Sequence, residues 1–473
     1  MYNSFVRAIN KTTVPILVCI SLLSTTYIYI YSINYGEEYL CLLPFVYGLF
    51  SISLYAGVSF TKKSIFIQVL TLVGFFRYIV HPVLTVYLGG YEGRSSLAPD
   101  EGDYISAIYL MSYELICVAI IIAIFEYKNR YKPFLLSSDF RVAFGIKASS
   151  ILLITSVFLL FISPKSILLI SFVIPNPVQM AEEDVSSMVR LFAFIFIIAK
   201  TIFVINVMYY VKLKDSKVQS KKYQAVVLLS IIIGMLIYMG TNRTDILVNA
   251  VILLLFAYKL FGKPIIKMAV LGAVIVPMIL VAVTKHREYV VQDDSKLANI
   301  NDYTQVYFGG VYNVAVGLGI EKNFPEASSF SVLAYDILRP MVGVNILVKS
   351  WNLKYSNMYY NDRIWRHVDR RSQIIPMIAQ GNLFFGKVLS PILTILFVMI
   401  GYYFIGMSNK NISLELKFII TLILARLGFV FGQNTMNFVN DISMNLFIFL
   451  ALLSFIKILK TKKHEKSGFY SRP

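Results

Sequence analysis

The stretch LFAFIFIIAKTIFVINVMYYV, residues 191–211, decides the fold class. Lys200 is its only charged residue, and the stretch is long enough to cross a bilayer as an α-helix. Similar blocks recur along the 473-residue chain, in which 57% of residues are hydrophobic and 15% are charged. Soluble domains carry about 25% charged residues, and a membrane β-barrel would show short alternating strands instead. The sequence therefore predicts an all-α polytopic integral membrane protein.

About twelve transmembrane spans are predicted. The first follows Arg7 and Lys11, as a signal peptide would, but it is too long for a signal segment and lacks a small-residue cleavage site. The fifth contains Pro164, so we expect it to kink or end early. The predicted spans lie near residues 14–32, 40–60, 65–88, 104–125, 148–172, 188–211, 224–240, 245–261, 266–284, 388–407, 416–432 and 441–459.

Lysine and arginine set the predicted orientation, because cytoplasmic loops carry an excess of them. With both termini cytoplasmic, the inward segments carry 25 of the 44 basic residues and the five short outward loops carry 3. The net charge of +18 is mostly this topological bias, so it is no evidence for a nucleic-acid partner. Cys19, Cys41 and Cys117 all fall within predicted spans, where they build neither a disulfide framework nor a cysteine-based metal site.

One long segment, residues 285–387, separates the ninth predicted span from the tenth. Long loops without function are uncommon, so we expect a folded, outward-facing cap with interfacial helices. Residues 301–319 should lie against the membrane or pack on the helix bundle, and residues 374–386 should form a short re-entrant or interfacial piece. The predicted organisation is transmembrane helices one to nine (1–284), the cap (285–387), transmembrane helices ten to twelve (388–460) and a basic cytoplasmic tail (461–473).

Within the predicted cap, the stretch NDRIWRHVDRRSQ at 361–373 is unusually cationic. Its basic residues recur at helical spacing and would share one face if the stretch is helical. Arginine suits planar, multidentate recognition of phosphate, so such a face could seat a pyrophosphate. The alternative is a solvated basic helix, or one that rests on anionic lipid headgroups. The residues concerned are Arg363, Arg366, His367, Arg370 and Arg371.

Ionisable side chains inside predicted spans are costly, and by default they mark pairing or function. Arg77 and Glu114 lie at similar predicted depth on neighbouring spans, so an ion pair between them is the simplest account. Arg190 and Arg426 lie toward the outer ends of their spans. Together with Arg243, in the turn described next, they could converge with the cationic stretch on one outward cavity, which suggests a lipid-linked phosphate as substrate.

The stretch MGTNRTDILVNAVILLLF at 239–256 forms a short outward turn between two predicted spans. Its polar residues suit the N-cap of the following helix. Arg243 would then point into a helix N-terminus, which is a ready anion site. The alternative is a turn with a local pair between Arg243 and Asp245.

These features resemble the O-antigen and capsule repeat-unit polymerases, the Wzy family. The resemblance lies in the plan of most of the chain, with many helices, inward termini and one long outer loop late in the chain. The turn at 239–256 is similar to the G-x-x-R turn of these polymerases and of O-antigen ligases, but it reads Asn-Arg-Thr where Ser-Arg-Gly is commoner. The segment from Arg363 onward, with RRSQIIPMI at 370–378, resembles their catalytic outer loop.

This resemblance implies a metal-independent glycosyltransferase of the bacterial plasma membrane that needs no cofactor. It would join oligosaccharide repeat units carried on undecaprenyl pyrophosphate, at the outer face, into an O-antigen, capsule or exopolysaccharide. Membrane lipids, a flippase and a chain-length regulator would be its partners. The expected substrate-binding residues are Arg77, Arg190, Arg243, Arg363, Arg366, Arg370, Arg371 and Arg426.

His367 is the expected catalytic residue, as general base on the attacking sugar hydroxyl. Neighbouring arginines would favour its neutral form, which a base requires. Equally, His367 could only hydrogen-bond a phosphate or a sugar. The rival bases are Asp302, Asp336, Asp362 and Asp369.

Three other functions compete with this interpretation. A lipid-linked oligosaccharide flippase would share the spans and the arginines, but many transporters show two similar halves, and here residues 285–387 have no counterpart in the first half. A metal-dependent glycosyltransferase would use early acids such as Glu37, Glu38, Asp100 and Asp103. A membrane acyltransferase would place a histidine deep in a span, for which His81 is the candidate.

Overall fold

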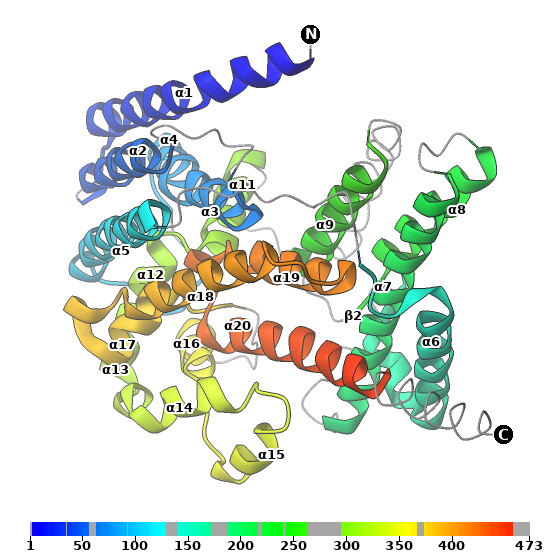
Figure 1. The fold of residues 1–473 in the computed structure, drawn as a ribbon. Helices are drawn as coiled ribbons and strands as arrows, with labels where there is room; N and C mark the ends of the chain where they lie inside the picture. Colours follow the sequence, from blue (N-terminus) through cyan, green and yellow to red (C-terminus); the bar gives the residue numbers. More distant parts are fainter. Residues whose placement is uncertain are drawn as a thin grey trace, which may run out of the picture. The chain divides into compact units, whose positions relative to one another are not determined.

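The computed structural model is almost entirely helical (Figure 1). The chain divides into two compact units: unit 1 comprises Met1–Leu135, Val291–Asn409 and Leu424–Asp441, and unit 2 comprises Leu136–Val290, Lys410–Ile423 and Ile442–Pro473. The structure describes residues 2–34, 36–55, 63–91, 93–128, 141–172, 187–215, 220–239, 243–262, 295–366 and 373–456. Within these ranges the side chains of residues 2–12, 55, 128, 187, 243–246 and 349 are not described.

Unit 1 begins with long apolar helices. α3 runs through a π-helical turn, Phe76–Val80, directly into α4, so the three form one continuous rod. α2 packs between α1 and α5. The helices are α1 (Tyr2–Tyr31), α2 (Leu42–Tyr55), α3 (Ile65–Phe75), α4 (His81–Tyr87) and α5 (Glu101–Lys128).

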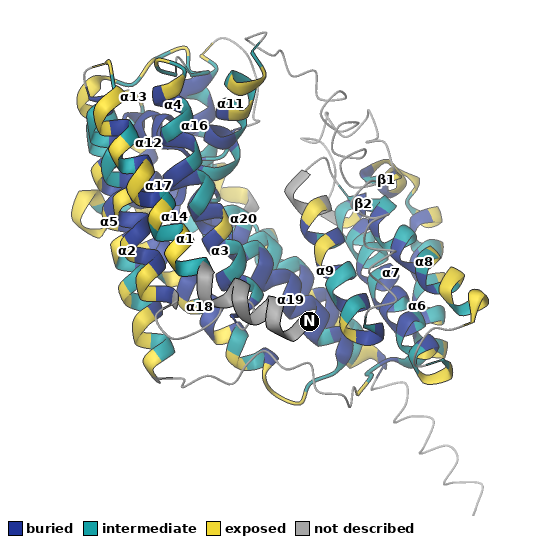
Figure 2. Cartoon of the chain, turned by 90° about the horizontal axis from the view of Figure 1, so that it is seen from above, coloured by how far each residue is buried: buried dark blue, intermediate teal, exposed yellow. Residues whose placement is uncertain are grey.

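The described part of the predicted cap is a series of short helices that belongs to unit 1. Gly309 ends the first of them with φ +64°, a left-handed conformation that glycine adopts without steric cost. α12 is buried along nearly its whole length, against α5 and α17 (Figure 2). Residues 301–319 therefore pack on the helix bundle, the second of the two expected placements. The helices are α11 (Lys296–Phe308), α12 (Val311–Leu318), α13 (Ile320–Asn323), α14 (Phe330–Leu338), α15 (Asn345–Val348) and α16 (Ser356–Ile364).

Two further helices of unit 1 meet at a sharp bend. α17 (Met377–Leu389) and α18 (Ile392–Ser408) are bent by 108° across the break at Ser390 and Pro391. The pair is therefore either one broken span or a re-entrant segment followed by a span. α17 occupies the stretch where a short re-entrant or interfacial piece is expected.

Unit 2 contains α6 (Gly145–Ile162), which ends just before Pro164, as expected from the missing N–H of proline. The carboxylate of Glu415 caps this helix by accepting hydrogen bonds from the main-chain N–H groups of Ala143 and Phe144 at 3.0 and 3.1 Å. A two-stranded antiparallel sheet, which the sequence does not predict, pairs β1 (Ile170–Phe172) with β2 (Ile237–Met239). The remaining helices are α7 (Ser187–Lys214), α8 (Lys221–Leu236) and α9 (Arg243–Phe261).

Two helices near the C-terminus have residues in both units. They are α19 (Leu414–Leu427) and α20 (Thr435–Ile442), the second of which continues through a π-helical turn, Ser443–Phe447, to Ile456.

Among the described residues, seven helices are long and apolar enough to cross a membrane, or eight if α17 and α18 count as one broken span. α8 and α19 fall on two more predicted spans but have only 16 and 14 residues. The predicted span at 266–284 lies outside the described residues. The chain is thus a helical membrane protein, while twelve spans and the orientation of the termini stay predictions.

Candidate functional site

The cationic stretch at 361–373 does not form the continuous helix that its spacing predicts. α16 ends at Ile364, because Trp365 has φ −112° and ψ 37°, outside the helical range. Arg363 lies inside the helix and is buried, whereas Arg366 follows in a turn and is exposed. These two arginines therefore do not share a helix face. The predicted cationic helix face is wrong for them.

A tertiary hydrogen bond explains where α16 ends. The main-chain N–H of Ser96, in the connection between α4 and α5, donates to the carbonyl oxygen of Ile364 at 2.9 Å. In a continuing helix that carbonyl would accept from the N–H four residues later. Hydrophobic periodicity carries no information about such a distant donor, so the sequence could not reveal it.

The chain that returns after the cationic residues is paired back to α16. The side-chain oxygen of Asn361 accepts from the N–H of Gln373 at 3.0 Å, and its amide donates to the carbonyl of Gln373 at 2.8 Å. One turn earlier, the side-chain oxygen of Asn357 accepts from the N–H of Ile375 at 2.9 Å. We call these contacts the asparagine clamp. It fixes the chain at Gln373 and Ile375 against α16.

Three predicted site residues fall outside the described residues. They are His367, the expected general base, and Arg370 and Arg371.

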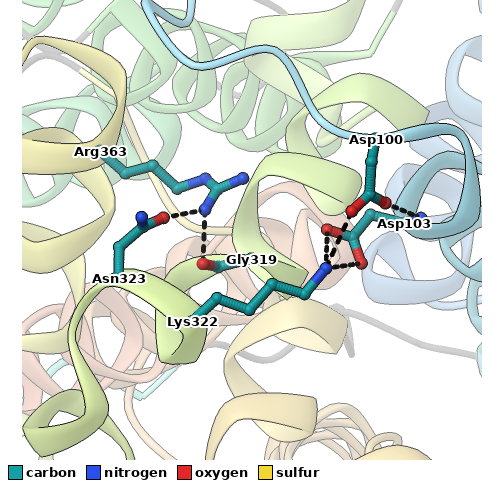
Figure 3. Close-up of polar contacts among 6 residues, drawn as sticks. All are labelled: Asp100, Asp103, Gly319, Lys322, Asn323 and Arg363. Atoms are coloured by element: carbon teal, nitrogen blue, oxygen red, sulfur yellow. Dashed lines mark hydrogen bonds and ion pairs between the residues drawn. The ribbon is translucent and has the colours of Figure 1, made fainter.

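Arg363 is held by oxygen acceptors of α13 and its N-terminus (Figure 3). Its Nη1 donates to the carbonyl oxygen of Gly319 at 2.5 Å and to the side-chain oxygen of Asn323. Burial lowers the pKa of Arg363, while the charges of Asp103 and Asp100 oppose that shift. The buried side chain of Arg363 therefore joins the end of α16 to α13.

Lys322 links α13 to the start of α5 (Figure 3). Its Nζ lies 3.0 Å from a carboxylate oxygen of Asp100 and 2.9 Å from one of Asp103. Asp100 also accepts from the N–H of Asp103 at 2.7 Å, which satisfies a free donor at the helix start. Hydrogen bonds from Lys322 to Asp103 and Asp100 raise the pKa of the lysine. Asp100 and Asp103, which are candidate metal ligands of a metal-dependent glycosyltransferase, thus form ion pairs with a lysine.

Two rival bases make ion pairs. Asp302 accepts from Nε of Arg94 at 2.7 Å and from the hydroxyl of Tyr91 at 2.8 Å. Asp362 lies 3.3 Å from Nζ of Lys354 on an exposed surface. Asp369, a third rival, lies outside the described residues.

The fourth rival base, Asp336, is fully buried in a polar network at the start of α16. It accepts from the N–H of Ser356 at 3.1 Å, from the hydroxyl of the same serine, and from Nε2 of Gln380 at 2.8 Å. The side-chain oxygen of Gln380 in turn accepts from the hydroxyl of Thr435 at 2.8 Å. Asp336 therefore ties α14 to the starts of α16 and α17.

Arg77 and Glu114 form the expected ion pair. Nη1 of Arg77 lies 3.0 Å from Oε2 of Glu114, and both side chains are fully buried. The hydroxyl of Thr394 donates to Oε1 of Glu114 at 2.6 Å. The guanidinium also lies 5.3 Å from the ring centre of Tyr78 and 5.1 Å from that of Phe431, which is cation–π distance. Arg77 sits in the π-helical turn, a local irregularity that is frequent at functional sites.

His81, one helical turn beyond Arg77, is also fully buried. Its Nδ1 lies 3.0 Å from the side-chain oxygen of Asn301 and 3.4 Å from the hydroxyl of Thr85. These contacts join α4 to α11. A membrane acyltransferase would need this histidine to be accessible to substrate, which its burial does not favour.

The remaining predicted arginines are divided between the units. Arg426 is paired with Asp441 in unit 1. Arg190 is half-buried on α7 in unit 2, and Arg243 is the first residue of α9, also in unit 2, with its side chain outside the described part. Convergence of all these arginines on one cavity stays a prediction.

No protein-family model matches this chain, nor does any curated protein or any solved structure. Any function must therefore be inferred from the chain's own residues.

Spacing and composition do not single out the residues that hold the chain after the cationic segment against α16. Asn357 and Asn361 stand four residues apart, so they share one helix face, but asparagine is a poor helix former and its spacing alone does not single it out. Asp336 was considered as a base, whereas its contacts are those of a structural anchor. Nothing in the sequence around Gln380 indicates its role, except that it is a polar residue in an apolar stretch.

We predict that Glu114→Gln destabilises the protein strongly, because it leaves Arg77 charged and buried without a counter-ion. The expected loss in free energy of unfolding is about 3–5 kcal/mol. Arg77→Met together with Glu114→Gln should recover much of it, and thermal unfolding in detergent measures both. Glu321→Gln, at an exposed site, is the control. A single Glu114→Gln variant as stable as the unmodified protein would contradict this account.

We also predict a pH dependence from Asp336. Burial raises the pKa of its carboxyl from 3.8 to about 6, against the hydrogen bonds from Ser356 and Gln380. Because the folded pKa exceeds the unfolded one, the native state holds this proton more tightly. The resulting stability, about 3 kcal/mol, is full below about pH 4 and is lost as the pH rises through about 6.

Thermal unfolding between pH 4 and 7 checks this contribution. Asp336→Asn should flatten the decline in melting temperature across that range, whereas Asp362→Asn, at a largely exposed carboxyl, should leave it unchanged. An identical decline in the Asp336→Asn variant would show that another group causes it.

Proposed function

We propose that this protein is a membrane glycosyltransferase that polymerises undecaprenyl-pyrophosphate-linked oligosaccharide repeat units at the outer face of the bacterial plasma membrane. The observation that supports this most is the asparagine clamp, which holds Gln373 and Ile375, just after the cationic residues, against α16. A phosphate seat needs cationic groups on a well-supported frame. We further propose twelve spans with both termini in the cytoplasm.

The arginines of the proposed site have different roles. Arg77 and Arg426 pair with acids of the chain, and Arg363 donates to oxygens of α13. Their guanidinium groups support the frame. Arg366 is exposed, and with Arg370 and Arg371 it is proposed to contact the pyrophosphate.

In the proposed reaction, a sugar hydroxyl of one repeat unit attacks the anomeric carbon of the growing chain. A new glycosidic C–O bond forms, and the C–O bond to the polyprenyl pyrophosphate breaks. The hydroxyl proton passes to a base, for which His367 is proposed. Negative charge gathers on the leaving pyrophosphate, where pre-placed arginines stabilise it electrostatically without a metal or a cofactor.

We predict that deletion of the gene leaves single repeat units on the cell surface and abolishes long polymer. The surface glycans and the lipid-linked glycans of each leaflet are profiled by mass spectrometry. A flippase, the alternative function, would instead leave its repeat units on the inner leaflet. That result would reject the polymerase.

Complementation of the deletion tests the roles of the arginines. Arg366→Ala combined with Arg370→Ala should lower polymer synthesis about 100-fold, as loss of transition-state donors does, with the amount of protein in the membrane unchanged. Lys410→Ala, at an exposed site, should restore full synthesis. Polymer of normal amount and length from the double variant would disprove the pyrophosphate seat.

A further inference from the structure

Between α14 and α16 the chain makes an excursion that carries α15 at its end (Figure 1). Gly343 opens it with φ +86°, and Asn352 closes it with φ +50°, both left-handed conformations. α15 and a short 3₁₀ turn, Lys349–Trp351, lie between these two residues. We call residues 343–352 the prong.

The prong exposes large apolar side chains. Ile346 is 72% exposed, Leu347 is 74% exposed and Trp351 is 43% exposed. Val348 points the other way and is only 3% exposed, so the prong has one face in unit 1 and one face outside it. Contiguous apolar surface of this kind marks contact with a partner or a membrane.

The prong and its flanks in the sequence carry only basic charged residues, one of which, Lys354, is paired with Asp362 of α16. The sequence RPMVGVNILVKSWNLK, residues 339–354, contains Arg339, Lys349 and Lys354 and no acidic residue. The side chain of Lys354 is 55% exposed. Exposed aliphatic residues next to a tryptophan and lysines suit the boundary between the headgroups and the acyl chains of an anionic membrane.

We propose that the prong inserts into the headgroup–acyl boundary of the bilayer that holds unit 1. Unit 1 also contains α1 to α5, which include helices able to span a membrane, so the prong belongs to a unit that a bilayer would hold. Trp351 would lie at the boundary, Ile346 and Leu347 among the upper acyl carbons, and Lys354 at the anionic headgroups. Exposed aliphatic residues beside a tryptophan, flanked in the sequence by basic residues only, favour this lipid surface over a second protein.

The inference is independent of the reaction proposed above. It has a consequence for that reaction, because only three residues separate the prong from α16, which is followed in the sequence by the cationic segment. A prong fixed at the membrane surface would hold that segment near the headgroups, where a lipid-linked pyrophosphate lies.

Tryptophan fluorescence tests the proposal directly, since the chain has only two tryptophans. The full-length Trp365→Phe variant keeps Trp351 as its sole tryptophan. It is reconstituted into vesicles of phosphatidylglycerol and phosphatidylcholine, with bromine on the acyl chains of the latter. Bromine near the headgroup end should quench the emission more strongly than bromine near the methyl end, and aqueous iodide should quench it little.

Matched variants make the result specific. Ile346→Ser with Leu347→Ser, in the same background, should lower quenching by bromine about twofold by weakening insertion. Where that variant does not fold, Lys349→Glu with Lys354→Glu should lower it in anionic vesicles. Trp351→Phe, which keeps Trp365, reports the background.

Three outcomes would overturn the proposal. Strong quenching by iodide without quenching by bromolipid would place Trp351 in water. Quenching by neither would mean that a protein surface covers the prong. Strongest quenching by bromine near the methyl end would place the prong in the bilayer core.

Discussion

The buried pair of Arg77 and Glu114 is the constraint around which unit 1 is arranged. A charge in an apolar interior is tolerated only with an opposite charge and further polar or aromatic contacts. Glu114 comes from α5, its second partner Thr394 from α18, and the ring over the guanidinium from Phe431. Four segments distant in sequence must therefore meet at one point, which limits how the apolar helices can slide along one another.

Two buried carboxylates accept hydrogen bonds at the starts of helices. Asp336 accepts the N–H of Ser356 at the beginning of α16, and Glu415 accepts two N–H groups before α6. In each case a carboxylate satisfies donors that a helix leaves free, and its charge complements the positive end of the helix dipole. Asp336 thus holds the start of α16, and Ser96 bonds its last carbonyl.

Features with a local cause were predictable from the sequence. Apolar blocks identified helices long enough to cross a membrane, Pro164 ended α6, and matching depths identified the Arg77–Glu114 pair. The predicted cationic helix face was wrong because helical spacing assumes a continuous helix. The carbonyl at the end of α16 instead accepts a hydrogen bond from Ser96, more than two hundred residues earlier in the chain. The asparagine clamp could not be predicted from the sequence for a related reason. Its hydrogen bonds form only because the chain packs back against α16 at Gln373.

Because Arg363 and Arg366 do not share a helix face, a phosphate-binding site would be built differently from the one that the sequence predicts. A single helical face would have presented every arginine equally to solvent. Instead Arg363 uses its guanidinium to join α16 to α13, and Arg366 is exposed beyond it. Under the proposed function, a buried arginine makes the frame rigid and the residues after it supply free donors to the substrate. This division suits catalysis, because donors that are held in place before the charge develops need no reorganisation when it does.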